Sequence, residues 1–404
     1  MGRYKQAFRD SVDSRVRDSL WAYRSRRDLS VATAVARNVL GLHHRVATTE
    51  EHLQATMSWL CAAQDATGVG AVAAFYDVRS GSYGPPYPET TGYIVPTFIN
   101  YAEFSGDQSY SQRALRMADW LLSLQLDNGA FPIGPLWPDW ERAPIVFDTG
   151  QIIHGLVSAH NLSGDAKYLR SARRAGDWLV DILGPDGSWN KFTSLGLVHT
   201  YNVRTAWGLV RLAETSQDDR YLSTAVKNLE WSLAQQDEDG WFRNTGFRLN
   251  EDPLTHTIAY TIEGLLESGM LLKNQRLIDA ARLAADALME FQRRDGYLRA
   301  RYGTGWHSDN QWSCLTGNAQ MAMIWFTLFD LAGEKKYLDA AYQANRYLKQ
   351  RQTRFSKLPG VSGGVAGSYP IYLDYEPYRN LNWAAKFFAD SLLLEARLST
   401  ENGK

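Results

Sequence analysis

Two kinds of apolar segment alternate along the chain and predict paired helices. In one kind, apolar residues at helical spacing share the helix with Lys, Arg and Asp, as in residues 105–125, 163–183, 216–236, 272–292 and 332–352. In the other kind nearly the whole circumference is apolar, as in residues 147–162, 199–214, 256–271, 314–331 and 379–398. A helix with one polar face lies at the surface, whereas one that is apolar all round is buried. The pattern therefore predicts an outer and an inner set of helices.

The outer segments repeat one sequence plan, which predicts a closed ring. Each has a polar turn, then an aromatic residue or leucine, then a helix of small and large apolar residues. The markers, which recur roughly every 55 residues, are Tyr110, Tyr168, Tyr221, Leu277 and Tyr337. A period of this length fits a helical hairpin. Residues 51–64 supply a further outer helix and the segment after Glu89 a further inner one.

Six hairpins of this kind predict an all-α fold, an (α/α)6 toroid. We expect residues 51–404 to form this toroid as a single catalytic domain. Residues 1–50 are expected to form an N-terminal helical extension packed on its outside.

The connections between the segments are unequal, and this asymmetry predicts where a site lies. Turns from an inner to an outer segment are short and polar, such as SGDQ and SQDD. Connections from an outer to an inner segment are long, Gly-rich and aromatic: residues 127–144, 184–197, 237–253, 293–312 and 355–378. Long ordered loops in a compact domain are usually functional. We expect them to converge over the N-termini of the inner helices, where helix dipoles and free backbone N–H groups point into a shared cleft.

The aromatic content exceeds what a core normally needs, with 14 Trp and 21 Tyr. Much of this surplus falls in the long connections, where flat rings beside Asn, Asp, Glu and Arg suit a sugar ring with apolar faces and polar edges. A competing interpretation is that some rings, such as Trp189 and Trp241 in the repeated DGSW and DGWF, only fill gaps between hairpins. The residues expected to bind substrate are Trp137, Trp140, Asn202, Tyr260, Trp306, His307, Asn318, Tyr375 and Arg379.

Polar residues in the first turns of the inner helices are candidates for chemistry. Aligning three inner segments on Gly155, Gly208 and Gly264 gives two equivalent levels. One level holds Asp148, Tyr201 and Thr257, and the other, three residues later, holds Gln151, Arg204 and Tyr260, with His199 and His256 just upstream of the first. We expect the acid, the histidines, the tyrosines and the arginine of this set to face one opening at similar depth. Structural alternatives remain for several: a helix N-cap for Asp148, a buried ion pair for Arg204 and a structural role for either histidine.

Two kinds of carbohydrate chemistry fit this set. Hydrolysis of a glycosidic bond needs two carboxyl groups, one protonated as the acid and one acting on water. Glu89, at the start of the first inner helix, and Asp148 are the candidate pair, with alternatives in the loops at Asp139, Glu141, Asp309, Asp374 and Glu376. Elimination or epimerisation of a uronic acid would instead use Tyr201 or His256 for proton transfer, with His199 and Arg204 nearby. A glycan-binding toroid without catalysis is a third alternative.

The stretch FDTGQIIHGLVSAHNLSGDAKYLRSA resembles the catalytic inner helix of the unsaturated glucuronyl and rhamnogalacturonyl hydrolases of the six-hairpin glycosidase superfamily. In that pattern an Asp opens an apolar helix that runs into a TGD-x-x-Y turn, so the resemblance implies that Asp148 is the catalytic acid. HTYNVRTAWGL is similar to a second segment of the family and implies that Arg204 and Trp207 lie near the substrate. ETTGYIVPTFINYAEFSGDQSY is similar in layout to a third.

Charge and cysteine content narrow the partners. A net charge of −1 provides no field to attract nucleic acid or anionic membranes. Only Cys61 and Cys314 are present, too few for a disulfide framework or a Cys-based zinc site. No leader-like or membrane-spanning run is apparent, so we expect a cytoplasmic enzyme without metal or cofactor. Its expected partner is an oligosaccharide or polysaccharide, and uronic-acid-containing substrates are favoured by Arg204, Arg299, Arg301 and Arg379.

Overall fold

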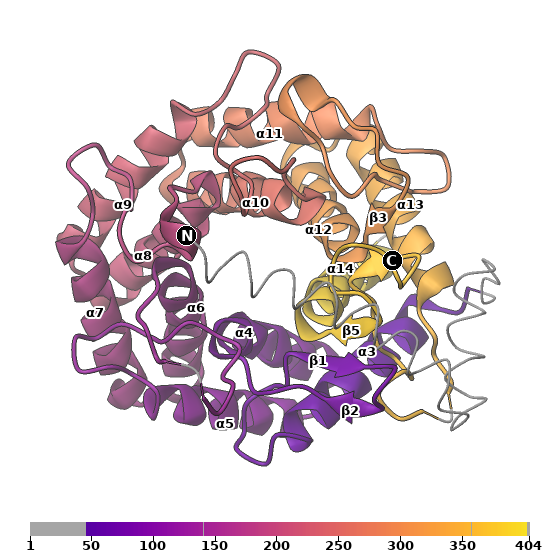
Figure 1. The fold of residues 1–404 in the computed structure, drawn as a ribbon, viewed down its shortest axis with the longest axis horizontal. Helices are drawn as coiled ribbons and strands as arrows, with labels where there is room; N and C mark the ends of the chain where they lie inside the picture. Colours follow the sequence, from indigo (N-terminus) through magenta and orange to yellow (C-terminus); the bar gives the residue numbers. More distant parts are fainter. Residues whose placement is uncertain (1–45, 140, 357, 402–404) are drawn as a thin grey trace, which may run out of the picture.

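A computed structural model describes residues 46–139, 141–356 and 358–401, and within these ranges twelve α-helices form two concentric rings (Figure 1). The inner ring consists of α4 (Pro88–Ser105), α6 (Val146–Ser163), α8 (Val203–Ser216), α10 (Thr255–Leu272), α12 (Leu315–Ala332) and α14 (Asn382–Glu401). The outer ring consists of α3 (Thr49–Asp65), α5 (Ser109–Leu122), α7 (Ala166–Asp181), α9 (Asp219–Leu233), α11 (Gln275–Met289) and α13 (Lys335–Arg351). Each inner helix contacts the next, and α14 contacts α4 to close the ring. The predicted (α/α)6 toroid is confirmed. The expected extension over residues 1–50 lies almost entirely outside the described residues.

The repeated sequence plan marks contacts between neighbouring outer helices. The Tyr168 hydroxyl donates to Asp119 of α5 at 2.8 Å, and the Tyr221 hydroxyl donates to Asp177 of α7 at 2.9 Å. In α7, α9 and α11 the polar turn before the marker also caps the helix: the side chains of Asp165, Asp218 and Asn274 accept hydrogen bonds from the backbone N–H groups two residues later. One repeat thus caps its own helix and ties it to the preceding hairpin.

A glycine after each outer helix packs against the backbone of the next outer helix. Gly296 has φ +87°, and a methyl group there would overlap the backbone carbonyl of Gln343 in α13. Gly363 has φ +82° and a methyl would overlap the carbonyl of Ala55 in α3, which joins the last hairpin to the first. Left-handed backbone and close approach both favour glycine. Equivalent close approaches recur at Gly70, Gly129, Gly187 and Gly240.

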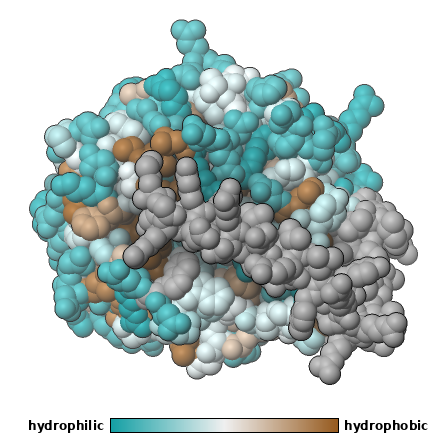
Figure 2. Space-filling model, in the orientation of Figure 1, coloured by the Kyte–Doolittle hydropathy of each residue, from teal (hydrophilic) through white to brown (hydrophobic). Residues whose placement is uncertain are grey.

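The unequal connections are confirmed, and the long ones collect at the N-terminal end of the inner helices. Their backbones pair in short strands: β1 (Phe75–Asp77), β2 (Ser82–Tyr83) and β5 (Arg379–Leu381) form one antiparallel sheet, and β3 (Ser313–Cys314) pairs with β4 (Ser368–Tyr369). Three 3₁₀ turns, η1 (Ser194–Gly196), η2 (Thr200–Asn202) and η3 (Thr304–Trp306), lie in other long connections. The β1–β5 pairing joins the first long connection to the last. The face shown in Figure 2 is mostly hydrophilic, with separate hydrophobic patches.

We expect Gly296→Ala to destabilise the protein by more than Gly333→Ala, a matched control. Both glycines have left-handed backbone, but nothing lies within 4 Å of a methyl at residue 333. The control should therefore lose only the conformational advantage of glycine, about 1 kcal/mol, whereas Gly296→Ala should lose about 2 kcal/mol more through overpacking. Urea unfolding measures both. Equal losses would contradict the packing role of Gly296.

Candidate active site

A cavity of about 200 Å³ lies at the N-terminal end of the inner helices, beneath the long connections. Residues from four inner helices and five connections line it: Tyr87, Glu89, Thr90, Tyr93, Ile133, Gly134, Ile145, Phe147, Asp148, Ser194, Tyr201, Phe247, His256, Tyr260, Tyr375 and Trp383. Six of these were candidates from the sequence: Glu89, Asp148, Tyr201, His256, Tyr260 and Tyr375. The structure thus brings both members of the expected carboxyl pair into one cavity.

Close packing of α4 against α6 places the two carboxyl groups together. A methyl at Gly92 would lie 2.7 Å from Cα of Ile152, and one at Gly155 would overlap the Gly92 carbonyl, so the two helix backbones are nearly in contact. Glu89 lies one turn before Gly92, and Asp148 lies in the first turn of α6. The packing of α4 against α6 therefore sets the spacing of the pair.

Neither carboxyl group caps its helix. Asp148 is 3% exposed, and its Oδ2 accepts a hydrogen bond of 3.0 Å from the backbone N–H of Gly134, in the connection before α6. Glu89 is 7% exposed, and its Oε2 accepts a hydrogen bond of 2.6 Å from the Tyr87 hydroxyl. No side chain caps the N-terminus of α4 or α6. The N-cap alternative for Asp148 is therefore wrong.

Burial raises the pKa values of both carboxyl groups. Burial raises the pKa of Glu89 to about 7, while the Tyr87 hydrogen bond and the Arg204 charge act in the opposite direction. Burial raises the pKa of Asp148 well above its usual value, and the negative charge of Glu89 raises it further. Two neighbouring acids in an apolar site cannot easily both ionise. Near neutral pH the buried pair therefore holds at least one proton.

Aromatic rings wall this cavity. Phe147 lies 5.1 Å from both Tyr201 and Tyr260 between ring centroids, and His256 lies 4.3 Å from Tyr260. Burial lowers the pKa of His256 to about 4, so that this imidazole is neutral near pH 7, and its Nδ1 lies 2.6 Å from Oε1 of Gln320. Burial likewise raises the pKa of Tyr201, which keeps its hydroxyl protonated. The walls are therefore uncharged around the two acids.

His199 supports the wall from outside the cavity. Its ring stacks on Tyr201 with centroids 4.5 Å apart, and its two nitrogens lie 3.1 Å from the carbonyl oxygen of Gly246 and 2.9 Å from that of Ser194. It lines a separate cavity of about 330 Å³ between the connections. This geometry matches the structural alternative for the residue, because both nitrogens are engaged by the backbone.

Arg204 does not line this cavity. It is 1% exposed and forms a buried ion pair with Glu263, while its Nε donates to Gln151 at 3.0 Å. Arg204 therefore matches the structural alternative given from the sequence, a buried ion pair. Asn202, in η2, is also buried and does not line the cavity.

The candidates in the long connections mostly hold those connections together. Trp306 is buried against Trp241 and its indole donates to the Asp239 carbonyl at 3.0 Å, and Trp189 is buried with its indole bonded to Leu179. Arg379 pairs with Glu376 at 2.5 Å, and Asn318 donates to Ser313. Trp137 is 39% exposed and His307 is exposed, both outside the cavity.

Trp140 lies outside the described residues. None of the alternative loop acids, Asp139, Glu141, Asp309, Asp374 and Glu376, lines the cavity.

Several lining residues were not candidates from the sequence. Tyr87 holds Glu89, and the Trp383 indole donates to the Tyr375 hydroxyl at 3.0 Å, while Phe147 and Phe247 complete the walls. Tyr87 carried a usable signal, since it stands two residues before Glu89 at a helix start. Phe247 lies in a connection, and nothing in its local sequence indicates that it points inward.

The described residues contain no group of three or more His, Cys, Asp or Glu side chains arranged to hold a metal ion. None of the described helices is both long enough and apolar enough to cross a membrane.

The raised pKa values make folding stability depend on pH. Glu89 and Asp148 bind protons more tightly in the folded protein than in the unfolded chain. Their contribution to the free energy of unfolding is therefore fully present below the pKa of the unfolded chain, and it is lost as pH rises through the pKa of the folded protein. We expect wild type to lose roughly 2 to 3 kcal/mol more than Glu89→Gln between pH 5 and 8.5. Urea unfolding at both pH values measures this. Asp139→Asn, at an exposed site, serves as control, and an equal loss in Glu89→Gln would contradict the burial of this acid.

No protein-family model and no curated protein matches the sequence. Solved structures do match its fold. An unsaturated glucuronyl hydrolase from Bacillus sp. GL1 aligns with a TM-score of 0.68 at 15% identity, over 87% of this chain and 98% of that one. A family 76 α-mannanase from Bacteroides thetaiotaomicron aligns with a TM-score of 0.63 at 14% identity, over 89% of this chain and 98% of that one. A polysaccharide lyase aligns with a TM-score of 0.62 at 13% identity, over 88% of this chain and 99% of that one.

The structural likeness extends over nearly the whole length of each of these proteins. The resemblance to six-hairpin glycosidases expected from the sequence is thus confirmed as a likeness of fold: this chain has the (α/α)6 toroid of the unsaturated glucuronyl hydrolases.

Proposed function

We propose that the protein is a carbohydrate-active enzyme, a glycoside hydrolase that cleaves an oligosaccharide with Asp148 and Glu89. The observation that carries this proposal is the buried pair of carboxyl groups with raised pKa values in one aromatic cavity. A pair of neighbouring carboxyl groups, one protonated and one ionised, is what hydrolysis of a glycosidic bond needs. The fold, shared with glycoside hydrolases, adds support.

We assign the proton of the pair to Asp148 and the negative charge to Glu89, which accepts a hydrogen bond from the Tyr87 hydroxyl. Protonated Asp148 donates its proton to the glycosidic oxygen as the bond to the anomeric carbon breaks. Ionised Glu89 takes a proton from the water that attacks that carbon, so the leaving group gains one proton and the new hemiacetal gains the hydroxyl. Proton exchange with solvent then restores the starting state. The Tyr87 hydroxyl favours this assignment, because its hydrogen bond stabilises the ionised form of Glu89.

The walls suit a pyranose ring. Phe147, Tyr201 and Tyr260 present aromatic surface, while His256 and the tyrosine hydroxyls supply neutral hydrogen-bonding groups. An apolar, water-poor cavity also strengthens the electrostatic interactions of the acids with the developing positive charge on the sugar. The cavity of about 200 Å³ fits one sugar ring better than a polymer segment, which favours cleavage near a chain end.

The substrate class is supported less directly. Likeness to unsaturated glucuronyl hydrolases favours uronic-acid-containing oligosaccharides as the first class to test. The four arginines that suggested this class from the sequence are engaged elsewhere: Arg204 with Glu263, Arg299 with the backbone carbonyls of Ser308 and Asn310, Arg301 with Asp374 and Arg379 with Glu376. The described lining residues include no Arg or Lys. A uronate carboxylate would therefore have to lie at the mouth of the cavity, whereas a neutral ring fits beside the acids directly.

Elimination is supported less well than hydrolysis. A lyase must neutralise a uronate carboxylate and then remove a proton from the adjacent carbon, and no described Arg or Lys lines the cavity. Tyr201 is a poor base because burial raises its pKa, and the pKa of about 4 makes His256 a weak one.

We expect Asp148→Asn to reduce kcat by about 10²- to 10⁴-fold, because the leaving oxygen loses its proton donor. The assay follows new reducing ends by mass spectrometry on a panel of neutral and uronic-acid-containing oligosaccharides, intact and lyase-treated. Asp139→Asn is the matched control and should retain activity, since Asp139 is exposed and outside the cavity. Full activity in Asp148→Asn would exclude it as the acid.

The same panel separates elimination and simple binding from hydrolysis. We expect no gain of ultraviolet absorbance from a conjugated double bond on intact uronides, and only a modest loss of kcat in Tyr201→Phe, because its hydroxyl positions the sugar without moving a proton. Loss of absorbance on lyase-treated substrate would identify unsaturated uronides. A gain of absorbance that disappears in Tyr201→Phe would replace hydrolysis with elimination, and affinity without product would indicate a binding protein.

A further inference from the structure

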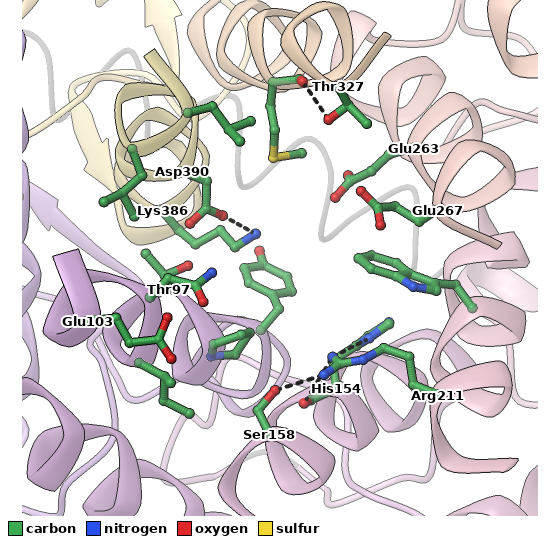
Figure 3. Close-up of a pocket in the computed structure, with 18 of the residues that line it drawn as sticks. Thr97, Glu103, His154, Ser158, Arg211, Glu263, Glu267, Thr327, Lys386 and Asp390 are labelled. Atoms are coloured by element: carbon green, nitrogen blue, oxygen red, sulfur yellow. Dashed lines mark hydrogen bonds and ion pairs between the residues drawn. The ribbon is translucent and has the colours of Figure 1, made fainter. Parts of the chain in front are cut away.

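A second, larger cavity of about 610 Å³ lies inside the inner ring at the other end of the helices. We call it the back cavity. Side chains from all the inner helices line it, as Figure 3 shows: Thr97 and Glu103 from α4, His154 and Ser158 from α6, Arg211 from α8, Glu263 and Glu267 from α10, Thr327 from α12, and Lys386 and Asp390 from α14. The proposed hydrolysis uses none of these residues.

A layer of side chains separates the back cavity from the candidate active site. Tyr93 and Tyr260 meet with their hydroxyl oxygens 3.5 Å apart, and the Arg204 guanidinium lies 4.9 Å from the Tyr260 ring centroid and 5.6 Å from that of Phe387. Tyr93 is the one residue that lines both cavities among those described. The back cavity is therefore a separate compartment, and what it binds does not depend on the proposed reaction.

The charges around the back cavity balance. Four basic and four acidic side chains line it: Arg204, Arg211, Lys386 and Arg397, and Glu103, Glu263, Glu267 and Asp390. Two buried pairs compensate each other directly, because Arg204 contacts Glu263 and the Lys386 ammonium lies 2.6 Å from Asp390. A balanced lining favours neither a strongly charged anion nor a strongly charged cation.

Two charged groups nevertheless remain available to a ligand. The Arg211 guanidinium donates to the Ser158 hydroxyl at 3.0 Å and to the backbone carbonyl of His154 at 3.4 Å, and it lies 3.3 Å from Nδ1 of the same histidine. All three partners are neutral, and no described carboxylate lies within 4.0 Å of Arg211. Glu267 accepts no hydrogen bond from any described residue. In Figure 3 the Glu267 carboxylate and the Arg211 guanidinium lie on the same side of the cavity, on adjacent helices α10 and α8.

Buried polar atoms without partners also line the back cavity. The Thr97 hydroxyl, on a residue with no exposed surface, and the Trp207 indole N–H have no hydrogen-bond partner among the described residues, and neither does Oδ1 of Asp390. A buried polar atom without a partner costs about 1 to 3 kcal/mol. These atoms supply two donors and two acceptors from three helices, and a ligand or water in the cavity would satisfy them.

We propose that the back cavity is a second binding site, which takes a neutral sugar ring. Vicinal hydroxyl groups both donate and accept, so they match the acceptor Glu267 and the donors Arg211 and Trp207 without adding net charge. The C–H faces of the ring would pack on the apolar lining from Pro96, Ile99, Met323 and Leu394. Burial and the nearby Glu263 charge raise the pKa of Glu267 to about 7, so this group can also donate a hydrogen bond near neutral pH.

The test measures binding in Asp148→Asn, which keeps the probes from being turned over at the candidate active site. Methyl α-glucopyranoside, methyl α-galactopyranoside and methyl α-mannopyranoside are titrated one at a time by saturation-transfer NMR. We expect at least one to bind, and Glu267→Ala to weaken its binding by about tenfold, the loss expected for a hydrogen bond to a charged group. Met323→Trp should weaken the same binding by narrowing the back cavity, whereas Trp137→Ala, in a connection at the opposite end of the ring, should leave it unchanged. Binding of a probe in the candidate active site would appear as a component that neither back-cavity variant changes.

Circular dichroism and thermal melting establish that each variant is folded, and Met323→Trp provides a readout if Glu267→Ala fails to fold. Absence of binding by all three glycosides would overturn the proposal. So would binding that both back-cavity variants leave unchanged, because the sugar would then lie elsewhere. Saturable binding of inorganic phosphate or spermidine in place of the glycosides would assign the cavity to an ion and equally overturn it. None of these outcomes bears on whether Asp148 is a catalytic acid.

Discussion

The contact between α4 and α6 is the constraint on which the candidate site depends. Gly92 and Gly155 allow the two backbones to approach nearly to contact, and any side chain at Gly155 would push the helices apart. Because Glu89 and Asp148 lie in the first turns of these same helices, their separation is set by backbone packing and not by flexible loops. Closure of the ring through α14 then brings Trp383 and the last connection over the pair.

Burial then gives the pair its chemistry. Burying one carboxylate in an aromatic cavity is unfavourable, and burying two is more so, which keeps a proton on the pair; we assign it to Asp148. The neighbours contribute by staying neutral: His256 cannot readily take the proton, and the tyrosines cannot readily lose theirs. Arg204, the nearest buried cation, is held by Glu263 in the layer below. The ring thus has one acidic compartment in front and a charge-balanced one behind.

The fold could be predicted from the sequence because periodicity and repetition report burial directly. The predicted helix bounds lie within a few residues of those in the structure, and the alternation of short and long connections predicted the end of the ring at which the cavity lies. The site could be predicted only in part. Residues in the first turns of the inner helices, such as Asp148 and Tyr260, have directions fixed by the helix, so they were found. Trp306 packs on Trp241 and Arg379 pairs with Glu376, so both contact other residues of the long connections and not the cavity. A long connection has no regular spacing of apolar residues from which the direction of a side chain could be predicted. Arg204 was misplaced because one helical turn moves a side chain from the front compartment into the layer beneath it.

Infrared difference spectroscopy of wild type against Asp148→Asn tests the central claim most directly, because the carbonyl stretch of a protonated carboxylic acid is resolved from that of a carboxylate. We expect a protonated-acid band at pH 7 that is present in wild type and absent in Asp148→Asn, with Glu89→Gln leaving that band in place. A spectrum at pH 7 with only carboxylate bands for both side chains would contradict it, since Asp148 could not then supply a proton to a leaving group.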